Sequence, residues 1–350
     1  MSKLSEYTDL LQKIVRTPSV SGNEKAVADL VAGFIAGKGK RVHRKLDNIW
    51  VESEPRECSK PTILLNAHLD TVAPSAGYSF DPFSGEIVDG KLLGLGSNDD
   101  GGSLVALLAA FFDLSSREQP YRLVYSATSM EENSGADGFD CVKADWGPVD
   151  LGIIGEPTGM QMAVAEKGLL VLDCIAHGKS GHAAREGGVN AIYEAMADIE
   201  WIRSFKFPKV SPFLGPVRMT TTIISAGSAH NVIPDACSFT VDVRPNGEYS
   251  NEVILSIIKQ NLKSEVKARS MKNNSSSISM QNPVVVRGQA LGLKAFGSPT
   301  ASNQIRCDFT TLKIGPGMSE RSHTPDEFIL VDEIEEAIKI YVDLLDKLKI

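Results

Sequence analysis

Short apolar segments separated by longer helical stretches run through the first half of the chain. The segments Ile49–Val51, Thr62–Leu65, Leu123–Tyr125 and Leu151–Ile154 are mainly apolar and do not alternate with polar residues. Such segments are typical of strands that are covered on both faces of a parallel sheet. Residues 103–114, between the second and third segments, have the length and apolar content of a helix. The alternation predicts an α/β fold, with a mainly parallel sheet flanked by helices.

Helices are also predicted at both ends of the chain. Residues 4–16 place leucine, isoleucine and valine side chains at helical spacing. Ser21 and Glu24 have the spacing of a capping box, which predicts a second helix over residues 23–37. Residues 331–349 have an amphipathic pattern that predicts a C-terminal helix.

The pattern changes after about Lys167, where strands and helices follow in a different order. Strands are predicted over 169–176, 219–226 and 236–244, and helices over 188–205 and 250–262. This content predicts a compact α+β domain of two layers. The polar segment 272–282 (KNNSSSISMQN) predicts a loop after it. We therefore expect residues 168–284 to be a domain inserted into a larger discontinuous one, made of residues 1–167 and 285–350.

Charge and cysteine content limit the possible partners and the compartment. The chain has 36 Lys and Arg residues against 44 Asp and Glu residues, a net charge of −8. Nucleic acid and anionic membranes bind basic faces, so we expect neither as a partner. The five cysteines are odd in number and widely spaced, which argues against a disulfide framework and a thiolate zinc site. The N-terminus lacks the apolar core of a signal peptide and no apolar run is long enough for a membrane span, so we expect a soluble cytoplasmic protein.

Acidic residues and a histidine follow the predicted strands. His68 ends the segment TILLNAH, Glu131 and Glu132 come soon after LVYSATS, and Glu156 comes soon after LGII. Open α/β sheets keep their sites at the carboxyl ends of the strands, where these side chains would meet. Adjacent acidic residues next to a buried strand are costly unless they share a cation or a proton. The sequence therefore indicates a cation site at this edge.

Three further residues extend the candidate site. Asp70 lies two residues after His68, on the same side of an extended strand, and can orient its imidazole; a polar turn is the alternative. The run Gly94–Gly102 (GLGSNDDGG) departs from a dinucleotide loop at Asp99, which is either a helix cap or a carboxylate aimed at a cation. A second histidine, His323, lies in SHTP. Two histidines with several carboxylates suit a pair of zinc-type ions, with one carboxylate as a bridge and another as general base.

Seven short motifs occur in a fixed order over essentially the whole chain: HLDTV, GxGxxD, EE, GEPT, SGHA, NVIP and SHTPDEF. This set resembles the M20 family of metal-dependent deacylases and peptidases, and within it the group of acetylornithine deacetylases and succinyl-diaminopimelate desuccinylases. The resemblance implies a zinc-exopeptidase-like catalytic domain, an inserted lid or dimerisation domain, and two divalent metal ions, zinc or cobalt. The implied ligands are His68 and Glu156 for one ion, Glu132 and His323 for the other, and Asp99 between them. Glu131 would be the general base, and Asp70 would orient His68.

The resemblance extends to three positions in the inserted domain. His182 in SGHA matches a histidine that reaches the active site of the partner subunit in a homodimer and stabilises the oxyanion. Asn231 in NVIP and Arg244 in DVRP match positions that hold the substrate, Arg244 through a carboxylate. A turn histidine is the alternative for His182, and a surface salt bridge is the alternative for Arg244.

Some positions do not follow the family pattern. Leu95 and Gly101 stand where members often have Arg and Lys, and because neither is a ligand, we expect them to affect local charge and substrate choice only. His230 could line the pocket. The hydroxyl-rich loop 297–302 could meet the substrate, with a plain turn as the alternative.

The resemblance implies hydrolysis of the amide bond of an N-acyl amino acid. The leading substrate is N-acetylornithine, which would place the protein in arginine biosynthesis. The alternatives are N-acetylcitrulline, the N-succinyl derivatives of ornithine, citrulline or diaminopimelate, and the substrates of the family's dipeptidases and aminoacylases. A non-catalytic metal-binding protein is disfavoured because the base Glu131 is present, and a serine hydrolase because the chain has no GxSxG motif.

Overall fold

The computed structural model describes residues 5–57 and 59–350 and divides the chain into two compact units. Unit 1 comprises the described residues up to Val164, together with Ile278–Phe296 and Ser302–Ile350. Unit 2 comprises Ala165–Ser277 and Gly297–Ala301. Cys58 and the first four residues, which include the start of the first predicted helix, lie outside the described residues.

Unit 1 is built on a mixed sheet whose four central strands are parallel. Their order is β6 (Arg122–Thr128), β3 (Thr62–His68), β7 (Leu151–Ile154) and β17 (Thr311–Lys313). Antiparallel strands flank these four: β1 (His43–Lys45) and β2 (Asn48–Glu52) lie beyond β6, and β8 (Met162–Glu166) lies beyond β17. Strand β8 also pairs with β16 (Ala295–Ser298), and its last two residues, which belong to unit 2, pair with β15 (Ser276–Ser277). Every residue of β3, β6 and β7 is buried, as their continuous apolar character predicts. The predicted mainly parallel sheet is confirmed.

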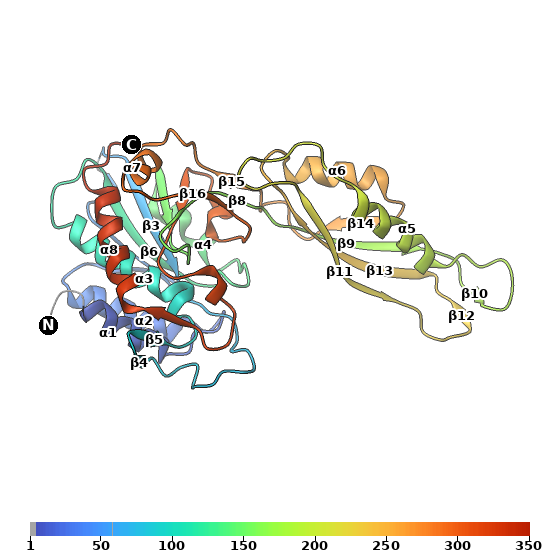
Figure 1. Cartoon of the computed structure of the whole chain (residues 1–350), viewed down its shortest axis with the longest axis horizontal. Coiled ribbons are helices and arrows are strands. Elements are labelled where there is room, and N and C mark those ends of the chain that lie inside the picture. Colours follow the sequence, from blue (N-terminus) through green and yellow to red (C-terminus); the bar gives the residue numbers. More distant parts are fainter. Residues whose placement is uncertain (1–4, 58) are drawn as a thin grey trace. The chain divides into compact units, whose positions relative to one another are not determined.

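Helices pack on both faces of this sheet. The larger core includes side chains of α1 (Ser5–Val15), α2 (Lys25–Gly37), α3 (Gly102–Leu114), α7 (Pro283–Ala290) and α8 (Val331–Leu345), and α3 packs against α8 (Figure 1). A smaller core includes side chains of α4 (Phe139–Val142) and Trp146. In β3, Ile63 and Leu65 belong to the larger core and Leu64 belongs to the smaller one, because side chains alternate across a strand. A separate small sheet contains β4 (Ile87–Val88), β5 (Lys91–Leu93) and β18 (Phe328–Leu330).

The predicted capping box before α2 is wrong, although the helix itself is present. Glu24 precedes Lys25, the first residue of α2, and its side chain makes no capping hydrogen bond. Its Oε1 accepts instead from the backbone N–H groups of Gly22 (2.9 Å) and Met130 (3.0 Å). The Ser21 hydroxyl donates to Asp70 at 2.6 Å. Tertiary partners have therefore replaced the local pair that the spacing predicted.

Unit 2 is a two-layer α+β structure, as predicted. Its sheet is antiparallel in the order β11 (Arg218–Ala226), β13 (Ala236–Arg244), β9 (Leu170–His177) and β14 (Glu265–Ala268). Helices α5 (Ala191–Ser204) and α6 (Asn251–Asn261) lie on one face of this sheet (Figure 1). A short ladder joins β10 (Gly181–His182) to β12 (Val232–Ile233). In neither unit does the described part of the chain contain a helix long and apolar enough to cross a bilayer.

Candidate metal centre

The carboxyl ends of three parallel strands in unit 1 bring the predicted ligands together. His68 is the last residue of β3, Glu131 and Glu132 follow β6, and Glu156 follows β7. Two groups of donor atoms have all members within 4.8 Å of one another: His68, Glu131 and Glu156 in the first, and His68, Asp99 and Glu132 in the second. The parallel register of β3 with β6 and β7 places these residues at one edge.

His323 completes the second group. Its Nε2 lies 3.0 Å from Glu132 Oε1 and 3.6 Å from Asp99 Oδ2. The hydrogen bond to Glu132 raises the pKa of His323 to about 9. All five ligands that the family resemblance implied therefore lie in one cluster of unit 1.

Asp99 lies between the two histidines, in the turn Ser97–Gly101 that precedes α3. Its Oδ1 is 3.2 Å from His68 Nε2, while its Oδ2 faces His323. The buried carboxylate of Glu327 accepts from the backbone N–H groups of Asn98 (2.9 Å) and Asp99 (3.0 Å) and so holds this turn. Sequence reasoning missed Glu327, although it belongs to the same SHTPDEF motif as His323.

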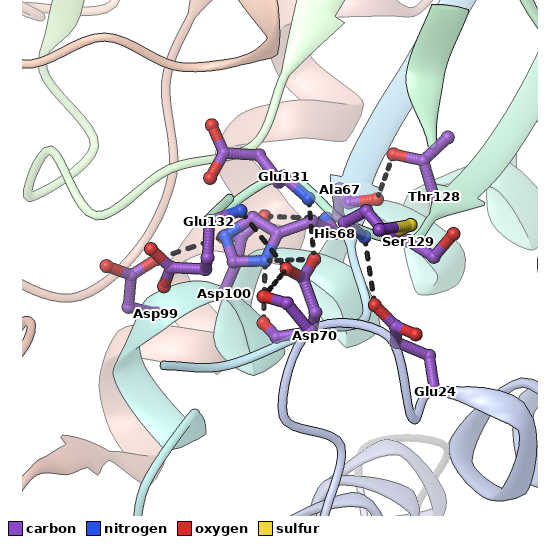
Figure 2. Close-up of polar contacts among 12 residues, drawn as sticks. Glu24, Ala67, His68, Asp70, Asp99, Asp100, Thr128, Ser129, Glu131 and Glu132 are labelled. Carbon is purple, nitrogen blue, oxygen red and sulfur yellow. Dashed lines mark hydrogen bonds and ion pairs between the residues drawn. The ribbon is translucent and has the colours of Figure 1, made fainter. Parts of the chain in front are cut away.

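Asp70 orients His68 through its main chain and the following loop through its side chain. His68 Nδ1 lies 2.8 Å from the Asp70 carbonyl oxygen, which can only accept, so the neutral ring carries its proton on Nδ1 and keeps Nε2 for a metal. The nearest Asp70 carboxylate oxygen is 3.5 Å from the ring nitrogen. That carboxylate accepts from the backbone N–H groups of Glu131 (2.9 Å) and Glu132 (3.1 Å) (Figure 2).

Burial and mutual repulsion perturb the acidic groups of the cluster. Burial raises the pKa of Glu131 to about 8, and the neighbouring Glu132 and Asp70 contribute in the same direction. Burial also raises the pKa of Glu156 well above its usual range. Burial opposes the charged form of His68, but Asp70 and the other acidic neighbours outweigh it and raise its pKa. A carboxyl or imidazole group with a raised pKa loses its proton when it binds a cation. A donor set of imidazoles and carboxylates therefore fits a pair of divalent ions.

The three predicted residues of unit 2 do not form one group. His182 and Asn231 are neighbours, since His182 pairs with Val232 and the Asn231 carbonyl accepts from Ala183 N at 3.0 Å. Arg244 is the last residue of β13, and its guanidinium makes a bidentate ion pair with Asp242 at 2.8 and 3.0 Å. A strand of this length spans roughly 25 Å, so Arg244 lies far from the other two.

The sequence left the roles of His230 and of the loop 297–302 undecided. His230 is exposed, next to Asn231. In the loop 297–302, the Ser298 carbonyl accepts from Lys167 N at 3.1 Å, and Ser302 caps the short helix Asn303–Arg306.

Comparisons with known proteins identify the family of this chain. The sequence model of peptidase family M20/M25/M40 matches residues 64–347 of this chain. The chain is 29% identical to acetylornithine deacetylase from Proteus mirabilis, over 98% of this chain and 97% of the relative. It is 30% identical to succinyl-diaminopimelate desuccinylase from Cereibacter sphaeroides, over 69% of this chain and 68% of the relative.

Solved structures share the fold. Aminopeptidase PepT from Bacillus cereus has a TM-score of 0.80 at 18% identity, over 98% of both chains. The YXEP protein of Bacillus subtilis, a dinuclear metal-binding peptidase of the M20 family, has a TM-score of 0.70 at 14% identity, over 98% of both chains. The sequence match carries the assignment: this chain belongs to the M20/M25/M40 peptidase family and is a hydrolase that acts on amide bonds.

Proposed function

We propose that this protein hydrolyses the amide bond of an N-acyl amino acid in the cytoplasm, with N-acetylornithine as the leading substrate. The observation that carries the proposal is the cluster of five ligand residues with the carboxylate of Glu131 among them. Similarity to acetylornithine deacetylase over nearly the full chain supports the acetyl group and a role in arginine biosynthesis. The four cysteines in the described part of the chain are free thiols, which suits a reducing compartment.

The chain's own residues have distinct tasks in this reaction. Two divalent ions, zinc or cobalt, would polarise the acyl carbonyl and lower the pKa of the attacking water to about 7. Glu131 takes the proton of that water and returns it to the departing amine. In the metal-free protein burial raises its pKa to about 8, and bound cations would lower that pKa, so that the carboxylate can accept a proton near neutral pH. His182 from a partner subunit stabilises the oxyanion.

A small substrate panel tests this proposal. The zinc-loaded protein is assayed for amine release from N-acetylornithine, N-acetylcitrulline, N-succinylornithine, N-succinyl-diaminopimelate and one dipeptide, with and without a chelator. We expect chelator-sensitive release, fastest from N-acetylornithine. Release from the dipeptide alone would overturn the deacylase proposal and favour a peptidase.

A basic cluster in unit 2 favours an N-succinyl substrate as the second candidate. Arg218 and Arg244 are directly opposite each other on neighbouring antiparallel strands, an arrangement that is unfavourable for like charges. Lys167 Nζ donates to the Pro216 carbonyl at 3.0 Å, two residues before Arg218, and the charges of Arg218 and Arg244 add to burial in lowering the pKa of Lys167. With Asp242 as the ion-pair partner of Arg244, the cluster retains a positive balance that suits a second carboxylate. Replacing Arg218 by Gln would then raise the KM of N-succinylornithine but leave that of N-acetylornithine unchanged.

We further propose a homodimer through unit 2. Large apolar side chains are exposed there: Tyr193 (68%) and Met196 (56%) on α5, and Ile223 (59%) and Ile224 (54%) on β11. The separation within unit 2 supports the same proposal, because one small acyl amino acid cannot contact both His182 and Arg244 of a single chain. A second copy would supply one of the two.

Complementation between two inactive variants tests this arrangement. Glu131→Gln removes the general base from the active site of its own subunit. His182→Ala removes the imidazole that this subunit would contribute to the active site of its partner. In a mixed dimer, one site would have both defects and the other would have neither. We expect mixing to restore roughly a quarter of wild-type turnover, since half of the dimers would be mixed. No recovery after verified subunit exchange would overturn the cross-subunit role of His182.

A further inference from the structure

The loop that carries the proposed base is held by its backbone. It follows β6 and contains Glu131 and the ligand Glu132. Three successive N–H groups of this loop each donate to a buried carboxylate. Met130 N donates to Glu24 at 3.0 Å, while Glu131 N and Glu132 N donate to the two oxygens of Asp70 (Figure 2). The direction of the Glu131 side chain therefore depends on two carboxylates outside the loop.

The Glu24 carboxylate comes from a segment far away in sequence, 106 residues before Met130. Glu24 is 1% exposed. The segment that precedes it is fixed to the end of the sheet, because Ser21 N donates to Thr71 O at 3.1 Å and Thr71 N donates to Ser19 O at 3.0 Å. The Ser21 hydroxyl also donates to Asp70 at 2.6 Å. Residues 19–24 therefore fix the positions of the Glu24 and Asp70 carboxylates, which in turn hold the loop.

The loop conformation needs this support. Met130 has φ of 56°, a left-handed conformation that is unfavourable for residues other than glycine. The turn is closed by Gly135 N, which donates to the Met130 carbonyl at 2.9 Å. Without Glu24, the N–H group of Met130 would lose its acceptor in a half-buried position, and the backbone just before Glu131 would be free to relax.

We propose that Glu24 is a positioning residue for the reaction, acting through the backbone of Met130 to aim the Glu131 carboxylate, with Ser21 supporting Asp70 in the same task. The inference rests on the proposed function, in which Glu131 is the base. Glu24 does not cap α2, because its side chain makes no capping bond; its local bond, accepted from the Gly22 N–H at 2.9 Å, lies in the turn before the helix.

Substitutions at Glu24 in the full-length, metal-loaded enzyme test the proposal. Glu24→Ala removes the acceptor, and we expect kcat to fall about tenfold or more while KM and the bound metal per chain stay unchanged. Glu24→Gln keeps an oxygen at the same reach and should recover most of kcat. Asp29→Asn is the matched control, since Asp29 is a more exposed acidic residue on α2 that pairs with Lys25 and Arg44.

A double variant separates positioning from general destabilisation. In a Glu131→Gln background there is no base to aim, so adding Glu24→Ala should lower the residual turnover by less than twofold. A loss by the same factor in both backgrounds, or wild-type kcat in Glu24→Ala, would overturn the proposal.

Hydrogen exchange gives a measurement that does not depend on activity. The peptide containing Met130–Glu132 should exchange faster in Glu24→Ala than in wild type or Asp29→Asn, and unchanged exchange would also overturn the inference. If wild type releases no amine from any substrate, the proposed function fails. A faster exchange in Glu24→Ala would then still show that Glu24 holds the loop, whereas active wild type with unchanged variants would contradict the positioning role alone.

Discussion

Replacing Asp70 by Asn tests whether its carboxylate holds the base loop or orients His68. The carboxylate accepts from three donors: the N–H groups of Glu131 and Glu132 and the hydroxyl of Ser21. Asn has the same shape but offers one oxygen and one NH₂ group, so at least one of these donors loses its acceptor. An unpaired buried N–H costs about 1–3 kcal/mol, and changing two bonds from a charged to a neutral acceptor costs about 1 kcal/mol each. The expected loss in the free energy of unfolding is about 3–5 kcal/mol.

Urea unfolding of the metal-free protein measures this loss. Trp50 and Trp146 are buried in unit 1 and Trp201 lies in unit 2, so a Trp201→Phe background makes tryptophan fluorescence report on unit 1 alone. Asp137→Asn is the matched control, because Asp137 is exposed in the loop after Glu132. If Asp70→Asn unfolded within about 1 kcal/mol of the control, the carboxylate would not be holding the loop.

Three further results are expected. Glu131→Gln should keep its metal content, measured by elemental analysis, and lose about 10²–10⁴-fold in kcat. In Gly315→Ala the new Cβ would lie 2.5 Å from the Glu156 carbonyl oxygen, so melting and metal titration should show about 1–3 kcal/mol of destabilisation and weaker metal binding. The raised pKa values of Glu131 (about 8) and His323 (about 9) mean that the folded metal-free protein holds more protons than the unfolded chain above pH 5. Its melting temperature should therefore fall as the pH rises from 6 to 9, a trend that zinc loading should remove.

The candidate metal centre was predictable because the topology of a parallel sheet converts sequence position into spatial position. His68, Glu131 and Glu156 each stand at or just after the end of an apolar segment, and the three strands are neighbours in the parallel sheet. Ends of parallel strands meet at one edge whatever the length of the crossovers between them. The strand pattern and the strand-end residues therefore contained most of the information. The motif order then added His323, which lies in a loop that no periodicity could place.

The supporting contacts were not predictable, because local spacing does not reveal which of two possible partners a polar side chain will take. Ser21 and Glu24 fit a capping box, yet each has a partner elsewhere in the fold: Asp70 for Ser21 and Met130 for Glu24. The Ser21 hydroxyl makes a charge-assisted bond to the buried Asp70 carboxylate, and a single oxygen of Glu24 accepts from both Gly22 and the distant Met130. The family resemblance implied that Asp70 orients His68. In the structure the Asp70 carbonyl orients the imidazole, and the Asp70 carboxylate holds the loop of Glu131. Residues that bear the chemistry are thus found from where strands end, while residues that aim them are found only once the fold has placed distant segments together.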